Sequence, residues 1–160
     1  MKKLILYITL IGVIQLCGSC NKDKKTATTG GGTTAWNWSG TAPFSVKLDG
    51  VAYLVPEAKI SIFDILGYYN INAKLTDDLS VALSLQSTVA VGEYTTPSPN
   101  NFTHTNQVSG YQGGATNAGG KIKIIQNSAT TIEGKFYGTV TSPLNQETHA
   151  IAEGYFKITK

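Results

Sequence analysis

The chain has 160 residues, of which 13 are lysine, none is arginine and 10 are acidic, giving a formal net charge of +3. Five of the lysines precede residue 42, so residues 42–160 carry eight lysines against nine acidic residues and are close to neutral. Nucleic-acid binding needs a concentrated basic surface, in which arginine is the preferred reader of phosphate and guanine, so this composition argues against DNA or RNA as a partner.

Residues 1–19 have the pattern of a secretory signal peptide. A basic start at Lys2-Lys3 is followed by an uncharged apolar run of 13 residues over 4–16, and small residues stand directly before Cys20. A membrane-spanning helix needs about 20 apolar residues, so the run is too short to span a bilayer. The pattern therefore predicts a leader that is cleaved before Cys20.

Cys20 is the residue expected to carry a membrane anchor. The sequence Cys17-Gly18-Ser19-Cys20 resembles a lipobox, in which the last cysteine is lipidated through its sulfur, although leucine is usual at the first position. The alternative is an ordinary signal peptide with a disulfide at Cys20, but removal of the leader leaves no second cysteine. We therefore expect a lipid at Cys20, and several acyl chains hold firmly because each buried methylene adds about 0.8 kcal/mol. Asn21, where an Asp would resemble an inner-membrane retention signal, favours the outer membrane, with a periplasmic and a cell-surface orientation both open.

Residues 20–41 are expected to form the lipidated cysteine and a flexible tether. The Gly/Thr-rich stretch 26–34 has no large apolar side chain to bury. A Gly-rich chain of this length spans about 25 Å. Trp36 and Trp38 interrupt the tether, and we expect one of them to dock on the domain edge or at the lipid interface, with an aromatic binding platform as the alternative.

Residues 42–160 have the size of one domain, and they open with a β-hairpin. Apolar and polar residues alternate on both sides of Asp49-Gly50, the favoured pair for a two-residue type I′ turn. This turn places the alternate apolar residues of both strands on one face: Phe44, Val46, Leu48, Val51, Tyr53 and Val55.

Three further strands are expected over residues 58–62, 69–75 and 79–85. The loop 76–78 must count as three residues, because that register pairs Ile71 with Leu83 and buries both apolar faces. Tyr68, Asn70 and Asn72 then face outward.

The C-terminal part carries a short internal echo. Glu133-Gly-Lys-Phe136 matches Glu153-Gly-Tyr-Phe156, which predicts two paired strands in which glycine admits a close neighbour and phenylalanine fills the core. No window has a helical period. We predict an all-β domain of about 8–10 short antiparallel strands, forming a sandwich or an open barrel.

The stretch 95–120 departs from this pattern, since it holds two prolines and five glycines. It reads as a long loop with one strand near 107–112, and long loops are often functional. Outward Tyr and Asn side chains would suit neutral sugars. The candidate ligand-binding residues are Tyr68, Asn70, Asn72, Phe102, His104, Tyr111, Tyr137 and Tyr155.

Several of these motifs resemble those of small outer-membrane lipoproteins of Bacteroidota-type bacteria. The similarity covers most of residues 43–158 and rests on Phe44-x-Val-x-Leu-Asp-Gly-x-x-Tyr, Gly92-Glu-Tyr94, Ile132-x-Gly-x-Phe and Gly154-x-Phe. Leu48 and Tyr53 stand where that family usually has Val and Trp. The resemblance implies an anchored β domain and supplies no catalytic residues, because the family has no established activity.

Catalytic chemistry has little support in the sequence. His104 and His149 lack a metal-ligand spacing and are expected to be exposed and neutral, and no nucleophile motif is present. We expect no catalytic residues, metal or cofactor, although a cleft holding His104 beside a carboxylate would indicate an enzyme. The expected function is a non-enzymatic surface or periplasmic interaction module with a glycan or protein partner. The alternative is a carbohydrate-binding accessory lipoprotein, which three contiguous tyrosines on one face would favour.

Overall fold

A computed structural model describes residues 36–115 and 120–160. The predicted signal peptide, Cys20 and the tether before residue 36 lie outside the described residues. The domain is all-β and antiparallel, as predicted. The strands of the described part are β1 (Phe44–Leu48), β2 (Val51–Val55), β3 (Ile60–Ile65), β4 (Tyr68–Lys74), β5 (Leu79–Gln86), β6 (Gly92–Thr95), β7 (Asn101–Asn106), β8 (Tyr111–Ala115), β9 (Lys121–Asn127), β10 (Thr131–Thr141) and β11 (Thr148–Thr159).

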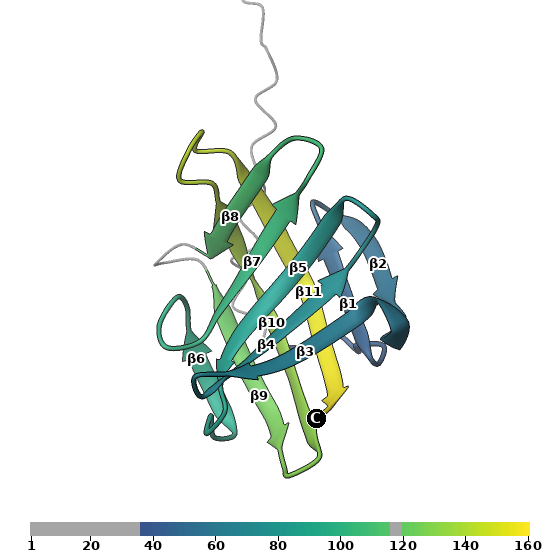
Figure 1. Cartoon of the computed structure of the whole chain (residues 1–160), viewed down its shortest axis with the longest axis vertical. Helices are drawn as coiled ribbons and strands as arrows, with labels where there is room; N and C mark the ends of the chain where they lie inside the picture. The colour runs from purple at the N-terminus through teal and green to yellow at the C-terminus, as the bar shows by residue number, and fades with distance from the viewer. Residues whose placement is uncertain (1–35, 116–119) are drawn as a thin grey trace, which may run out of the picture.

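The strands form one sheet that curls into a nearly closed barrel (Figure 1). The main path runs β2-β1-β11-β10-β8-β7-β5-β4-β3, and β9 pairs with both β10 and β6. Strands β3, β4 and β5 lie at the front of the view, with β10 and β11 behind them. The two edge strands of the path, β2 and β3, follow one another in the chain and are joined by a short 3-10 turn, η1 (Glu57–Lys59), without pairing to each other.

The first hairpin has the register predicted from its turn. Phe44 pairs with Val55 and Leu48 with Val51, around Asp49-Gly50, where both residues have positive φ as a type I′ turn requires. Phe44 and Leu48 are buried, whereas Val51 is 55% exposed. The apolar face is therefore covered less well along β2, because β2 is an edge strand.

The register of β4 and β5 is also confirmed, while the start of β3 is not. Ile71 pairs with Leu83, as the three-residue loop predicts, and both side chains are buried. Ala58 was expected in a strand, but it lies in η1, and β3 begins at Ile60. Pro56 lies just before this turn and has no N–H to donate to a ladder, which favours ending β2 at Val55.

The glycine–phenylalanine echo packs as predicted. Gly134 pairs with Phe156 and Gly154 with Phe136 across β10 and β11, and both phenylalanines are fully buried. A Cβ on Gly154 would lie 2.6 Å from the Phe136 Cε1 atom and 2.6 Å from the Phe136 carbonyl oxygen. The two glycines therefore leave room for the rings that fill the barrel.

The interpretation of residues 95–120 as a loop is wrong for residues 101–115. Strands β7 and β8 form a hairpin in which Thr103 pairs with Gly114, and the turn covers part of the stretch where a strand was expected. The alternation of Phe102 and His104 with threonines is a strand pattern. Turn-forming Pro, Asn and Gly residues on both sides obscure that pattern.

Candidate functional site

The outer face of β3 and β4 carries the predicted group Tyr68, Asn70 and Asn72. Their positions alternate along β4, so the three side chains share the face that points away from the core. On β3, Ile65 stands opposite Tyr68 and Phe63 opposite Asn70. Phe63 is 56% and Ile65 54% exposed, so the face combines apolar and amide groups. Sequence reasoning missed Phe63 and Ile65, although their alternation with the inward-facing isoleucines of β3 could have found them.

This face continues across β5 and β7 without acquiring charge. Ser84 of β5 stands between Asn70 and Asn101, and Ser80 shares a hydrogen bond with Thr105. The outward positions of β3, β4, β5 and β7 are Ser61, Phe63, Ile65, Tyr68, Asn70, Asn72, Lys74, Ser80, Ala82, Ser84, Gln86, Asn101, Thr103 and Thr105. Lys74, at the end of β4, is the only charged residue among these positions. We call these positions the front face.

The Asn72 side chain leaves one polar atom unsatisfied on this face. Its Oδ1 atom is buried and has no hydrogen-bond partner among the described residues. An unpaired buried acceptor costs roughly 1–3 kcal/mol, so this atom lowers the stability of the folded domain.

Phe102 and His104 lie on β7 and point into the barrel, so their expected placement on a loop is wrong. Phe102 is 0% and His104 1% exposed. The His104 Nδ1 atom lies 2.9 Å from the Ser80 carbonyl oxygen and donates to it. Burial lowers the pKa of His104, and this hydrogen bond opposes the shift. Tyr111 begins β8, but its side chain lies outside the described part of the structure.

The two histidines meet, although they are distant in sequence. The His104 and His149 rings are edge to face with centroids 5.2 Å apart. His149 Nδ1 lies 2.6 Å from Asp49 Oδ2, and His149 Nε2 lies 3.5 Å from Glu147 Oε1. His149 was expected to be exposed, yet its side chain is only 19% exposed. The carboxylates contact His149, and no group of three or more metal-binding side chains occurs among the described residues.

The hairpin turn holds this cluster in place. Asp49 Oδ1 accepts a hydrogen bond from the Ala150 backbone N–H at 2.8 Å, and the Asp49 N–H donates to the Ala150 carbonyl oxygen at 2.9 Å. The β1–β2 turn is thereby fastened to β11.

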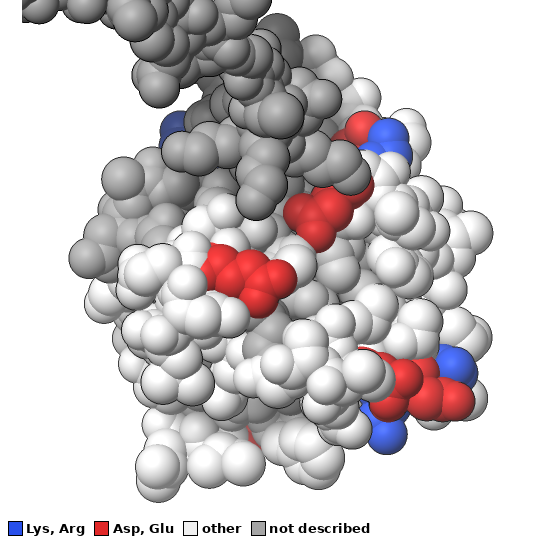
Figure 2. Space-filling view, turned by 90° about the horizontal axis from the view of Figure 1, so that it is seen from above, with Lys and Arg blue, Asp and Glu red and all other residues white. Residues whose placement is uncertain are grey.

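Figure 2 looks onto the barrel from above and shows a mainly uncharged surface with several acidic groups and few basic ones.

Tyr137 and Tyr155 are covered by the chain itself, which corrects their assignment as an open binding surface. Residues 36–41, expected to be part of a flexible tether, form a strap across the outside of β10 and β11. Trp36 and Trp38 both pack on Tyr137, with ring centroids 5.1 and 6.1 Å away. Docking of a tryptophan on the domain, expected for one residue, is thus confirmed for both.

Polar contacts fix the strap. Lys135 Nζ donates to the carbonyl oxygens of Trp36 and Trp38 at 2.9 and 2.7 Å, and Trp38 Nε1 donates to the Gly154 carbonyl oxygen at 3.3 Å. Tyr155 lies beneath Gly40 and donates to Glu133 Oε1 at 3.0 Å. Burial, together with the neighbouring carboxylate, raises the pKa of Tyr155 to about 12. Both tyrosines therefore serve packing, and they lie apart from Tyr68.

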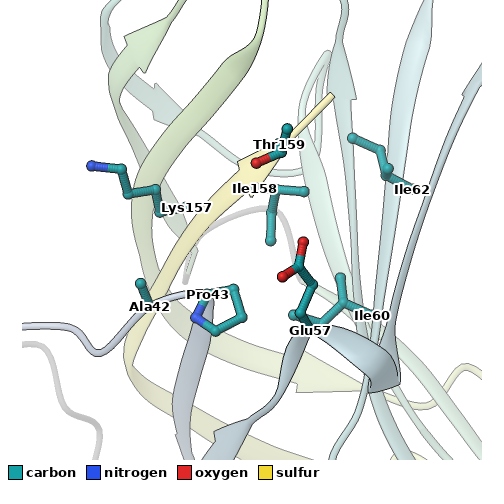
Figure 3. Close-up of a pocket in the computed structure, with 8 residues that line it drawn as sticks. All are labelled: Ala42, Pro43, Glu57, Ile60, Ile62, Lys157, Ile158 and Thr159. Atoms are coloured by element: carbon teal, nitrogen blue, oxygen red, sulfur yellow. The ribbon is translucent and has the colours of Figure 1, made fainter.

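A small cavity of about 340 Å³ opens where the barrel fails to close. Figure 3 shows its lining, which combines residues before β1, the η1 turn, β3 and the end of β11. We call it the seam pocket. Sequence reasoning missed it, because its two sides, η1 with β3 and the end of β11, are far apart in the chain and do not pair with each other.

Comparison of the chain with protein-family models, curated proteins and solved structures found no match of any of the three kinds. Within the described residues, no helix is long and apolar enough to cross a membrane.

Proposed function

We propose that the chain is a lipid-anchored outer-membrane lipoprotein whose barrel serves as a non-enzymatic interaction module on the periplasmic or cell-surface side. The anchor is Cys20, and the leader before it and the absence of a second cysteine in the mature chain support this assignment. The resemblance to Bacteroidota-type lipoproteins supports the same location.

The exposed apolar side chains of an edge strand carry the interaction part of the proposal. Within the part of the chain that the structure describes, β3 pairs along one edge only, and Phe63 and Ile65 on its outer face are more than half exposed. Natural edge strands are usually protected by charge, bulges or covering segments, and exposed apolar groups at such an edge mark contact sites. Burying one such side chain against a partner stabilises a complex by about 1.5–3 kcal/mol.

A carbohydrate is the second candidate for the partner, and the chemistry of the front face favours it. Phe63 and Tyr68 offer rings for stacking on sugar CH groups, and Asn70 and Asn72 offer amides for hydroxyls. The nearly uncharged front face suits a neutral glycan.

The anchor is tested by lipid labelling of the full chain. Cys20→Ser should abolish incorporation of radiolabelled palmitate and release the protein from membrane pellets, since the acceptor sulfur is removed. Cys17→Ser is the matched control, because it changes the other cysteine and should leave labelling intact. Unchanged labelling of Cys20→Ser would refute the anchor.

The interaction surface is tested by glycan-array binding and by cross-linking to surface proteins with the same full chain. Phe63→Ala and Tyr68→Ala should each weaken the partner contact about tenfold or more, the factor for roughly 1.4 kcal/mol. Leu144→Ala is the control, because Leu144 is 86% exposed but lies between β10 and β11. Binding to a neutral glycan would select the carbohydrate alternative. A partner unaffected by both variants would refute the assignment of this face.

A further inference from the structure

The seam pocket lies between two strands that do not pair with each other. Its apolar walls are Pro43, Ile60, Ile62 and Ile158 (Figure 3). Among residues 36–115 and 120–160, β3 pairs only with β4. The ladder between β1 and β11 stops at Phe44 and Phe156, and one hydrogen bond from the Lys157 N–H to the Pro43 carbonyl oxygen extends it. The barrel therefore leaves a slot whose lining is partly apolar and partly polar.

One carboxylate enters this slot. The Glu57 side chain rises between Ile158 and Ile60 in Figure 3, and it has no hydrogen bond or ion pair within the described part of the chain. Lys157 also belongs to the lining, but its side chain is directed away, and its Nζ atom lies 3.2 Å from Glu133 Oε2. The pocket thus presents an unpaired negative charge, while the nearby positive charge is already paired.

We propose that the seam pocket binds a small organic cation, a primary ammonium group on a compact apolar body. The apolar body would fill the space between the isoleucines, and the ammonium would donate to the Glu57 carboxylate. A volume of about 340 Å³ is near the lower limit of ligand pockets, which start at roughly 300 Å³, so the ligand is small. The negative charge of Glu57 disfavours carboxylates of the same shape. This site lies apart from the front face and does not depend on the lipid anchor.

The test uses the full chain in detergent, with cyclohexylammonium as the probe and cyclohexanol and cyclohexanecarboxylate as shape-matched comparators. Amide chemical shifts are followed by NMR. We expect saturable shifts centred on Ile60, Ile62 and Ile158, with the ammonium binding most tightly. Glu57→Gln should weaken ammonium binding about two- to fivefold, which corresponds to roughly 0.4–1 kcal/mol for an ion pair near water, and it should not weaken the binding of cyclohexanol.

Matched variants separate the pocket from general charge and bulk effects. Glu93→Gln removes a carboxylate on β6 that contacts Lys123 instead, and it should leave binding unchanged. Thr159→Trp should block the pocket, whereas Thr148→Trp, at the other end of β11, should not. The proposal is overturned if the carboxylate binds as tightly as the ammonium, if Glu57→Gln has no effect, or if the shifts do not saturate. Glu57→Gln alters one exposed side chain, so it decides the question even if Thr159→Trp does not fold.

Discussion

The contact between Gly154 and Phe136 gives the sharpest test of how the barrel is packed. In Gly154→Ala, the new Cβ would lie 2.6 Å from the Phe136 ring and also 2.6 Å from the Phe136 carbonyl oxygen. The ring could rotate away, but the carbonyl belongs to the neighbouring strand, so β10 and β11 must move apart. Overpacking of this kind costs about 1–3 kcal/mol, and contact with backbone places the expected value near 3 kcal/mol.

The assay is urea and thermal unfolding followed by far-UV circular dichroism. A loss of about 3 kcal/mol should lower Tm by roughly 10 °C in a domain of this size. Gly114→Ala in β8 is the matched control, because its nearest neighbours lie 3.8 and 3.9 Å from the added Cβ. That substitution should change the free energy of unfolding little and could slightly stabilise the fold by restricting the unfolded chain.

A second substitution separates the two clashes. Phe136→Leu in the Gly154→Ala background removes the ring contact but keeps the carbonyl contact. We therefore expect the double variant to be about 0.5–1.5 kcal/mol more stable than the sum of the two single effects, yet less stable than the unmodified chain. The packing argument is refuted if the free energy of unfolding of Gly154→Ala lies within about 0.5 kcal/mol of that of the unmodified chain. It is also refuted if Gly154→Ala and Gly114→Ala have the same free energy of unfolding.

Two other predictions concern the strap and the buried histidine. Lys135→Met should release the strap, because it removes the hydrogen bonds to the Trp36 and Trp38 carbonyl oxygens. We expect a red shift in tryptophan fluorescence and a decrease of about 1–3 kcal/mol in the free energy of unfolding, whereas Lys121→Met should cause neither change. For His104, a folded-state pKa below 6.5 means that the unfolded chain binds the proton first. The free energy of unfolding should therefore be level above pH 6.5 and decline as the pH falls below it. Urea midpoints measured against pH should show a shallower slope in His104→Leu than in the unmodified chain.

The sequence was sufficient for the features that depend on neighbouring strands. Asp49-Gly50 and the length of the 76–78 loop determined two registers, since a shift by one residue would expose an apolar face. The Gly-x-Phe echo correctly indicated the packing of β10 on β11. Of the candidate ligand residues, Tyr68, Asn70 and Asn72 were placed together on the expected face.

The features that sequence reasoning missed depend on segments distant in the chain. The His104–His149 pair exists because the sheet brings β7 and β11 to the same region of the barrel, and no local pattern encodes that approach. Phe102 was judged by the turn residues around it, although its alternation indicated burial. The two tryptophans indicated that the chain before residue 42 packs on the domain, but nothing in the sequence indicated that they pack on Tyr137 of β10.

The strap also determines where the domain can turn. Residues 36–41 are fastened to β10 and β11, so they move with the barrel as one rigid body. The strap lies against the rear wall, while β3, β4 and β5 form the opposite wall (Figure 1). In a chain anchored through a lipid at Cys20, the strap would join the barrel to its anchor on the side of β10 and β11. The opposite side, which bears Phe63 and Tyr68, would then face the medium.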